Sequence, residues 1–231
     1  MPKITIAIDG FSSTGKSTIA KQLGDWLDYI YVDTGAMYRA VTLFAMRSGF
    51  ISEIGVNTTA LENVLNGIDI HFEKNTTTSV AEVYLNGENV EKQIRTLEVS
   101  ENVSPVAAIS AVRSKLVEQQ QKMGQGKGFV MDGRDIGTVV FPDAELKIFL
   151  DASARTRAER RYKELLERGD TVTFEDVLAN VTERDHIDAT REDSPLIKAQ
   201  DAIAIDNSDM NLEDQFHIIL QLAKDRIAGR V

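Results

Sequence analysis

Eight consecutive residues near the amino terminus, Gly10 to Ser17, have the spacing of a loop that binds phosphate. They read Gly-Phe-Ser-Ser-Thr-Gly-Lys-Ser, so lysine and serine follow a glycine that comes five positions after the first one. The glycines let consecutive backbone amides point inward, where the positive end of the next helix also attracts phosphate oxygens. Lys16 would then reach the β- and γ-phosphates of a nucleoside triphosphate, and Ser17 would coordinate Mg²⁺. The residues predicted to bind the phosphate donor are Gly10, Ser12, Ser13, Thr14, Gly15, Lys16, Ser17 and Thr18.

The elements around this loop predict an α/β fold. An apolar run, Ile4 to Ile8, precedes the loop as a buried strand, and helical spacing covers Lys16 to Leu27. Four more short apolar runs follow in the sequence, and each of the five is followed at once by an aspartate. The runs are Ile4–Ile8, Tyr29–Val32, Gly128–Met131, Leu146–Leu150 and Ala202–Ile205, and the aspartates are Asp9, Asp33, Asp132, Asp151 and Asp206. Strands that alternate with helices predict a five-stranded, doubly wound parallel sheet flanked by helices, with ligands at the carboxyl ends of the strands.

Two segments interrupt this alternation and predict insertions within one domain of residues 1–231. Residues 58 to 100 contain two runs of alternating character, Ile68–Phe72 and Val80–Leu85, followed by Asn86-Gly87. Asn-Gly is a strong signal for a β-hairpin, so an inserted antiparallel lobe is expected there. Residues 154 to 195 have helical spacing and many charged side chains, which suggests a helical lid.

The composition excludes several classes of protein. A chain of 231 residues with 42% hydrophobic residues can bury a sizeable core. The net charge of −10 argues against nucleic acid or an anionic membrane as the main partner, so anionic ligands must be held by local basic clusters. The sequence has no cysteine, which fits a cytoplasmic protein. It has no run of about 20 apolar residues, and the apolar run before Asp9 is too short for an export signal.

Arginine residues follow two of the predicted strands. Arg39 lies one helical turn beyond Asp33-Thr34-Gly35, and Arg134 lies between Gly133 and Asp135 after the strand that ends near Asp132. Guanidinium groups at two strand ends can hold one phosphate from two sides. The sequence therefore predicts a second anionic ligand beside the triphosphate. Asp132 itself is placed where a carboxylate could bind Mg²⁺ through water.

Three groups of residues together resemble the bacterial cytidylate kinase family. They are Asp33-Thr34-Gly35-Ala36-Met37-Tyr38-Arg39, the segment Asp132 to Pro142, and Glu183-Arg184-Asp185 with Asp188, Arg191 and Pro195-Leu196. The similarity is collinear over nearly the whole chain. It implies a P-loop kinase that transfers the γ-phosphoryl group of ATP to CMP or dCMP with Mg²⁺, in which residues 58–100 form the monophosphate-binding lobe and 154–195 the lid.

The resemblance also implies roles for individual residues. Contacts to cytosine fall on Thr34, Arg113 and Asp135, contacts to the ribose on Ser104, Arg184 and Asp188, and contacts to the acceptor phosphate on Arg39, Arg134 and Arg191. The carboxylate of Asp135 could accept from the exocyclic amino group that distinguishes cytosine from uracil. Arg157 and Arg161 would hold the adenine ring and the donor phosphates. The implied catalytic groups are Lys16, Arg157, Arg161 and Arg191. The sequence departs from the family in two places. The loop has Phe11, Ser12, Ser13 and Thr14 where many members have a proline and smaller residues, and Thr34 replaces a frequent serine.

Other functions remain open on the residues alone. A kinase of the same architecture could act on UMP or another small acceptor. A GTP-binding switch or an ATPase subunit would share the loop, but the sequence has neither an Asn-Lys-x-Asp nor an LSGGQ-like segment, and a nucleotide sensor would need no second substrate. Arg155, Arg160 and Arg168 are expected to form exposed ion pairs along their helix. A monomer that binds only small molecules is expected.

Overall fold

The computed structural model describes residues 2–75 and 81–230, which fall into two compact units. The first unit combines residues 1–33 with 120–231, and the second runs from Thr34 to Gln119. Val80, which the sequence places at the start of a strand, lies outside the described residues. The elements of the first unit are β1 (Thr5–Gly10), α1 (Lys16–Leu27), β2 (Ile30–Asp33), β8 (Phe129–Gly133), the π-helical turn η3 (Ile136–Val140), β9 (Leu146–Asp151), α6 (Ala154–Glu167), α7 (Phe174–Thr190), β10 (Ile203–Asp206) and α8 (Leu212–Ile227).

The first unit is built on a parallel sheet of five strands in the order β10-β9-β1-β8-β2. The predicted α/β fold class is therefore confirmed, with each strand within about two residues of the predicted run. β1 is the central strand and pairs with β8 and β9, so the loop that follows β1 begins at the middle of the sheet. Asp33 is directly opposite Asp132 in the register of β2 and β8. Parallel pairing thus collects the carboxyl ends of all five strands along one edge.

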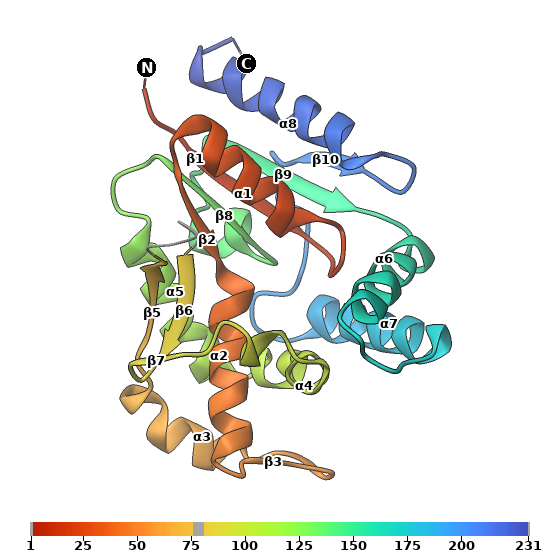
Figure 1. The fold of residues 1–231 in the computed structure, drawn as a ribbon. Helices are drawn as coiled ribbons and strands as arrows, with labels where there is room; N and C mark the ends of the chain where they lie inside the picture. Colours follow the sequence, from red (N-terminus) through yellow and green to blue (C-terminus); the bar gives the residue numbers. More distant parts are fainter. Residues whose placement is uncertain (1, 76–80, 231) are drawn as a thin grey trace. The chain divides into compact units, whose positions relative to one another are not determined.

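One face of this sheet is covered by α1 and α8, which lie side by side (Figure 1). Every second residue of β1 points to this face and packs, together with apolar residues of β8 and β9, against the two helices. Ile6, Ile8, Ile19, Leu23 and Ile219 are completely buried in this cluster. Burying side chains of this size contributes roughly 1.5–3 kcal/mol each. This packing fixes α1 against β1 and so determines the position of the loop that joins them.

The second unit combines helices with two small antiparallel sheets. Its elements are α2 (Thr34–Arg47), β3 (Ile51–Ser52), β4 (Gly55–Val56), α3 (Thr58–Val64), the 3₁₀ turn η1 (Leu65–Gly67), β5 (Ile70–Lys74), β6 (Ala81–Leu85), β7 (Glu88–Asn89), the 3₁₀ turn η2 (Gln93–Arg95), α4 (Leu97–Ala107) and α5 (Ser110–Met123), which continues past the end of the unit. β6 and β7 form a hairpin that turns at Asn86-Gly87 with φ of 50° and 81°. Positive φ at both positions is what a type I′ turn requires. The predicted antiparallel sheet is confirmed, but α3 and the first turn of α4 also fall within residues 58–100. The monophosphate-binding role of that segment stays a prediction.

The segment predicted as a lid forms α6 and α7, which pack on each other. Thr173 caps the start of α7 by accepting a hydrogen bond from the backbone of Asp176 at 3.1 Å, the bond that makes threonine a favourable N-cap. The role of these helices as a lid stays a prediction.

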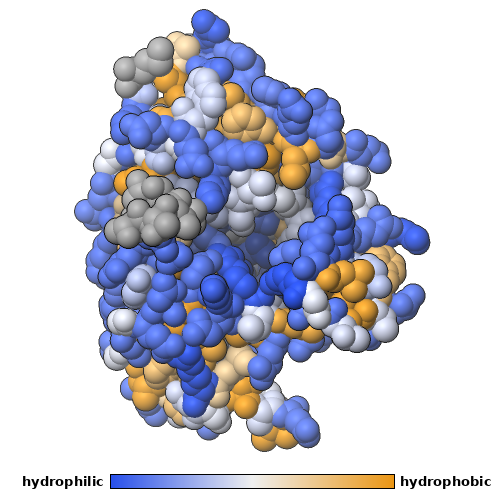
Figure 2. Space-filling view, in the orientation of Figure 1, coloured by the Kyte–Doolittle hydropathy of each residue, from blue (hydrophilic) through white to orange (hydrophobic). Residues whose placement is uncertain are grey.

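Figure 2 shows a face of the molecule on which hydrophilic residues predominate and hydrophobic residues form small scattered groups. Large hydrophobic side chains that are exposed include Trp26 and Ile30, at 53% and 68%. None of the helices in the described part of the chain is long and apolar enough to cross a membrane.

Candidate active site at the carboxyl edge of the sheet

We call residues Gly10 to Gly15 the phosphate-binding loop, after the role that the sequence predicts for them. Gly10, Ser13 and Gly15 have φ of 145°, 59° and 87°, values that L side chains rarely adopt. A Cβ atom at Gly10 would lie 2.0 Å from the backbone oxygen of Leu150 in β9. Glycine is therefore required at position 10 both by its φ and by the close approach of the neighbouring strand. The hydroxyl of Ser12 is buried and has no hydrogen-bond partner among the described residues.

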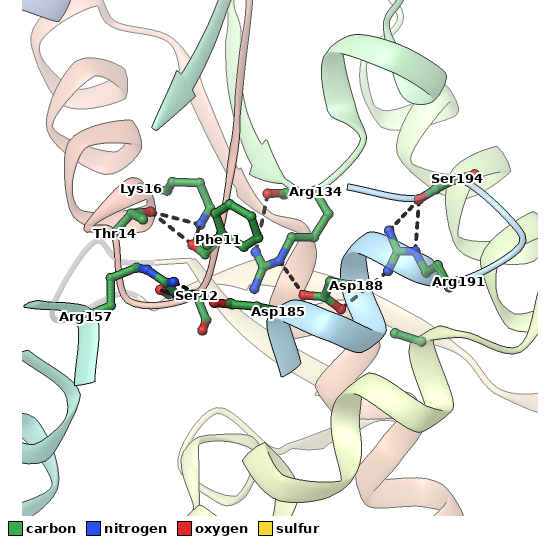
Figure 3. A network of polar contacts seen from close by, with 12 residues as sticks. Phe11, Ser12, Thr14, Lys16, Arg134, Arg157, Asp185, Asp188, Arg191 and Ser194 are labelled. Carbon is green, nitrogen blue, oxygen red and sulfur yellow. Dashed lines mark hydrogen bonds and ion pairs between the residues drawn. The ribbon is translucent and has the colours of Figure 1, made fainter. Parts of the chain in front are cut away.

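Lys16 lies at the start of α1 with its side chain folded over the loop (Figure 3). Its Nζ donates to the backbone oxygen of Phe11 and, at 3.2 Å, to the hydroxyl of Thr14. Burial and the positive charge of Arg134 lower the pKa of Lys16 well below its ordinary value. Anionic phosphate oxygens beside Nζ would reverse this effect by stabilising the ammonium form.

Ser17 and Asp132 bring two oxygen atoms together below the loop. The Ser17 hydroxyl donates to Oδ2 of Asp132 at 2.8 Å, and the phenol of Tyr31 donates to Oδ1 of the same carboxylate at 2.9 Å. Asp132 is 4% exposed, and burial together with nearby Asp33 raises its pKa to about 6. A cation beside these oxygens would stabilise the carboxylate. Ser17 and Asp132, predicted separately from the sequence, therefore meet at one place, and Tyr31 is a partner that the sequence did not suggest.

Asp9 connects the end of β1 to the segment that follows β8. Its Oδ1 accepts from the backbone of Ile136 at 2.8 Å, and its Oδ2 accepts from the backbone of Gly137 at 2.7 Å. Burial raises the pKa of Asp9 to about 7 against the opposing effect of these two donors. Asp9 thereby fixes the start of η3, immediately after Arg134 and Asp135. The sequence marked Asp9 only as one of five aspartates that follow apolar runs.

Asn207 joins the phosphate-binding loop to α6. Its Nδ2 donates to the backbone oxygen of Thr14 at 2.7 Å, while its side-chain and backbone oxygens accept from Arg160 at 2.9 and 2.7 Å. The expectation that Arg160 forms an exposed ion pair on its own helix is therefore wrong, because a buried amide from the end of β10 takes its guanidinium. Arg155 and Arg168 do pair along α6, with Glu159 and Glu164.

Two of the arginines predicted to hold an acceptor phosphate flank a single carboxylate. Arg134 Nε donates to Oδ2 of Asp188 at 2.8 Å, and Arg191 Nη1 lies 3.7 Å from Oδ1 (Figure 3). Arg191 also donates through Nε and Nη2 to the backbone oxygen of Ser194, at 2.9 and 2.7 Å. Burial opposes ionisation of Asp188, but the positive charges of Arg134, Arg184 and Arg191 outweigh it and hold its pKa below the ordinary value. The carboxylate keeps two guanidinium groups in place beside the end of β8.

The two arginines predicted to contact the donor differ in their surroundings. Arg157 is 3% exposed and bonds to Asp185, to Ala152 and to the loop residue Ser12. Arg161 lies one helical turn further along α6 and pairs with Glu164 at 3.0 Å. Both side chains come from the helix that follows β9, so they lie on the same side as the carboxyl ends of the strands.

The remaining predicted residues of the first unit are Thr18, Asp135 and Arg184. Thr18 lies in α1 and is exposed. Asp135 is 3% exposed, and its backbone oxygen accepts from Val139 and Val140 in η3. Arg184 lies in α7, one turn before Asp188, and is partly buried. The structure thus places six predicted residues in contacts around the phosphate-binding loop and the end of β8. They are Lys16, Asp132, Arg134, Arg157, Asp188 and Arg191.

Four predicted residues belong to the second unit. Thr34 is the first residue of α2 and is 2% exposed, Arg39 follows it by slightly more than one turn, and Ser104 is buried in α4. Arg113 is 3% exposed, donates to the backbone oxygen of Ala107 at 3.1 Å and has its guanidinium 5.4 Å from the centre of the Tyr38 ring. These contacts hold the planar side chain of Arg113 in one orientation. The roles of these four residues toward a nucleotide stay predictions.

The first unit therefore combines an amide-rich loop, a lysine and several fixed guanidinium groups at one edge of its sheet. Backbone amides and guanidinium groups bind and neutralise phosphate oxygens. The arrangement suits transfer between phosphate groups, which depends on positioning and charge neutralisation.

Comparison with known proteins agrees with this chemistry. The cytidylate kinase family model matches residues 6–225. A cytidylate kinase of Flavobacterium johnsoniae is 65% identical over 225 residues, which cover 97% of this chain and 98% of that protein. A cytidylate kinase of Flavobacterium psychrophilum is 60% identical, with 97% of this chain and 100% of that protein covered. The crystal structure of an uncharacterized protein from Eubacterium ventriosum has a TM-score of 0.50 at 12% identity and covers 97% of this chain and 99% of that one, which supports the fold alone. Since the family match extends over nearly the whole sequence, this chain belongs to the cytidylate kinase family.

Proposed function

We propose that this chain transfers the γ-phosphoryl group of ATP to CMP or dCMP, giving ADP and CDP or dCDP. The observation that carries the proposal is the grouping of two kinds of phosphate-binding group in one unit. The loop with Lys16 suits a triphosphate, and Arg134 and Arg191, both held by Asp188, suit a second phosphate. High identity to cytidylate kinases over almost the whole chain supports the cytosine nucleotide as acceptor.

In the proposed reaction an oxygen of the acceptor's 5′-phosphate attacks the γ-phosphorus, and the bond from that phosphorus to the bridging oxygen of ADP breaks. The acceptor oxygen is already anionic, so no strong general base is needed. Charge spreads over the three equatorial oxygens of a loose transition state. Lys16, Arg157, Arg161 and Arg191 would supply the compensating positive charge, while Arg39 and Arg134 hold the acceptor.

The remaining contacts follow the family's pattern and are part of the proposal. Thr34, Arg113 and Asp135 would read the base. Ser104, Arg184 and Asp188 would contact the ribose. The burial of Arg113 and Asp135, each 3% exposed, supports a role in specificity, because a buried polar group discriminates strongly against a ligand that leaves it unpaired.

Mg²⁺ is the proposed cofactor, and the Ser17 and Asp132 oxygens fit it. Their separation of 2.8 Å places two hard oxygen donors next to the loop, and Mg²⁺ characteristically uses few protein ligands together with water and phosphate oxygens. Ser17 would bind the ion directly and Asp132 through water. When bound, the ion neutralises charge on the β- and γ-phosphate oxygens. The monomeric state and the cytoplasmic location stay predictions.

A substrate screen tests the proposed function. ADP release would be measured with ATP and Mg²⁺ in the presence of CMP, dCMP, UMP, AMP or GMP, and without acceptor. We expect kcat/KM for CMP or dCMP to exceed that for the other acceptors by at least about 10-fold, the effect of one lost hydrogen bond of about 1.4 kcal/mol. Preferential use of UMP would assign the chain to the rival acceptor, and release independent of any acceptor would make it an ATPase.

A further inference from the structure

Arg157 is a buried arginine held by several hydrogen bonds at this edge of the sheet. Its Nε donates to the backbone oxygen of Ala152 at 2.8 Å, which ties the side chain to the start of its own helix. Its Nη1 also donates to the backbone oxygen of Ser12 in the phosphate-binding loop at 3.4 Å. The side chain is only 4% exposed. A guanidinium in this position needs partners, because a buried charge without them is strongly destabilising.

Asp185 is the charged partner. Its Oδ1 accepts from Nη1 of Arg157 at 2.9 Å and its Oδ2 accepts from Nη2 at 2.5 Å, so the contact is bidentate (Figure 3). Asp185 comes from α7 and Arg157 from α6. The pair therefore joins the two helices at the point where α6 meets the loop. Two parallel hydrogen bonds fix the plane of the guanidinium as well as its position.

Phe11 supplies the other surface against which Arg157 is held. The guanidinium carbon lies 5.0 Å from the centre of the Phe11 ring, and Phe11 in turn packs edge-on against Phe149 of β9 with ring centres 6.3 Å apart. A cation over an aromatic face at this distance is stabilised electrostatically. Phe11 is a member of the phosphate-binding loop, so the arginine rests directly on the loop.

We propose that Asp185 and Phe11 are positioning residues that hold the Arg157 guanidinium beside the phosphate-binding loop before the donor binds. The inference rests on the proposed function, in which Arg157 neutralises donor phosphate charge. Four hydrogen bonds and one ring contact determine the place of Arg157. A long side chain that is already ordered loses less conformational entropy when it engages a ligand. Without the Asp185 carboxylate, the buried guanidinium would lose its only ionic partner among the described residues and would turn toward water.

The decisive variant is Asp185→Asn, which keeps the size of the side chain and removes its charge and one acceptor. We expect kcat/KM for ATP to fall on the order of 10- to 100-fold, the effect of a misplaced catalytic group, while KM for CMP changes less than about 2-fold. Asp185→Glu should restore part of the loss. In an Arg157→Lys background, Asp185→Asn should have a much smaller effect, because both substitutions act through one guanidinium.

Glu159→Gln is the matched control. It removes the carboxylate partner of Arg155 on the same helix, an exposed pair at 3.1 Å in which Arg155 is 79% exposed, and should leave both kinetic constants unchanged. Phe11→Leu tests the ring independently of the ion pair and should also lower kcat/KM for ATP. If circular dichroism shows that Asp185→Asn does not fold, the kinetics of Phe11→Leu test the proposal instead, and an unchanged kcat/KM for ATP would contradict it.

Three results would overturn the inference. Asp185→Asn with a lower melting temperature but unchanged kinetics would make the pair purely structural. A higher kcat or a lower KM for ATP would mean that Asp185 competes with the donor for Arg157. Additive effects of Asp185→Asn and Arg157→Lys on kcat/KM for ATP would show that the two residues act independently. These results test the inference only if the wild-type protein phosphorylates CMP. A wild-type protein that does not phosphorylate CMP would instead contradict the proposed function.

Discussion

At the scale of single residues, buried aspartates are the distinctive feature of this site. Asp9, Asp132, Asp135 and Asp188 are each at most 5% exposed, yet their surroundings differ. Asp188 faces arginines and stays ionised more easily than usual, whereas burial dominates at Asp9 and Asp132 and raises their pKa. One residue type thereby orients guanidinium groups at Asp188, accepts from backbone amides at Asp9, and accepts from the hydroxyls of Ser17 and Tyr31 at Asp132.

The raised pKa of Asp9 predicts a pH-dependent stability. The pKa rises from 3.8 to about 7 on folding, so the native state favours the protonated form. Its contribution is fully present below the unfolded value of 3.8 and is lost as pH rises through 7. Relative to Asp9→Asn, the unfolding free energy of the wild type should therefore fall by a few kcal/mol between about pH 4 and pH 8, because a tenfold change in proton affinity corresponds to about 1.4 kcal/mol. Urea unfolding of both proteins across this pH range measures the difference between their unfolding free energies. A difference that does not change with pH would contradict the raised pKa of Asp9.

Asp135 leads to a prediction about specificity. Asp135→Ala removes the carboxylate proposed to accept from the amino group of cytosine. The ratio of kcat/KM for CMP over UMP should fall by about 10- to 100-fold, because a base-reading contact contributes about 1–3 kcal/mol of discrimination. Steady-state kinetics with both nucleotides provide the ratio. An unchanged ratio in a folded variant would remove Asp135 from the base site.

At the scale of elements, contacts with neighbouring strands determine the geometry of the segment formed by β1, the phosphate-binding loop and α1. Leu150 of β9 approaches Gly10, Asn207 after β10 holds the oxygen of Thr14, and Asp132 of β8 accepts from Ser17. Three strands thus contribute to the shape of a loop that follows a fourth. The loop sequence predicts phosphate binding, and contacts with the sheet fix the position of the loop.

Gly10→Ala tests this dependence on β9. The added Cβ would meet the Leu150 oxygen at 2.0 Å at a φ of 145°, so we expect a loss of more than about 3 kcal/mol of stability or failure to fold. Gly55→Ala is the matched control, because Gly55 has a φ of 114° with open space around its Cβ position and should lose only about 1 kcal/mol. Chemical denaturation gives both values. Equal losses would show that backbone strain alone, without the clash, explains the effect at Gly10.

At the scale of the whole molecule, the net charge of −10 contrasts with the positive groups at the carboxyl edge of the sheet. Lys16, Arg157 and Arg191 are all at most 8% exposed. Their positive charges are thus shielded from solvent. Their attraction for a bound anion is stronger than at the surface, because electrostatic interactions strengthen where water is excluded. A polyanionic ligand should accordingly bind and stabilise a protein whose surface is acidic on average.

Ligand-linked stability checks this conclusion. ATP with Mg²⁺ at about 100 times its Kd adds about 2.7 kcal/mol to the unfolding free energy, which corresponds to about 5–11 °C in Tm for a protein of this size. Lys16→Ala should lose most of the shift at the same concentration while keeping its own fold. Thermal scans monitored by circular dichroism measure both. A full shift in the variant would contradict the assignment of Lys16 to the phosphates.

Local chemistry in the sequence determined the elements, the phosphate-binding loop and the hairpin at Asn86-Gly87. Apolar periodicity and glycine conformation act over a few residues, which is why the five strands and the Lys16–Leu27 helix were predicted closely. The family resemblance added individual roles, most of which stay predictions. Tertiary structure alone decided that Asp9 fixes η3, that Asn207 holds the loop across 193 positions and takes Arg160 from its expected surface pair, and that Asp185 holds Arg157. These contacts depend on which strands become neighbours and which polar groups are buried together, and no local pattern encodes either.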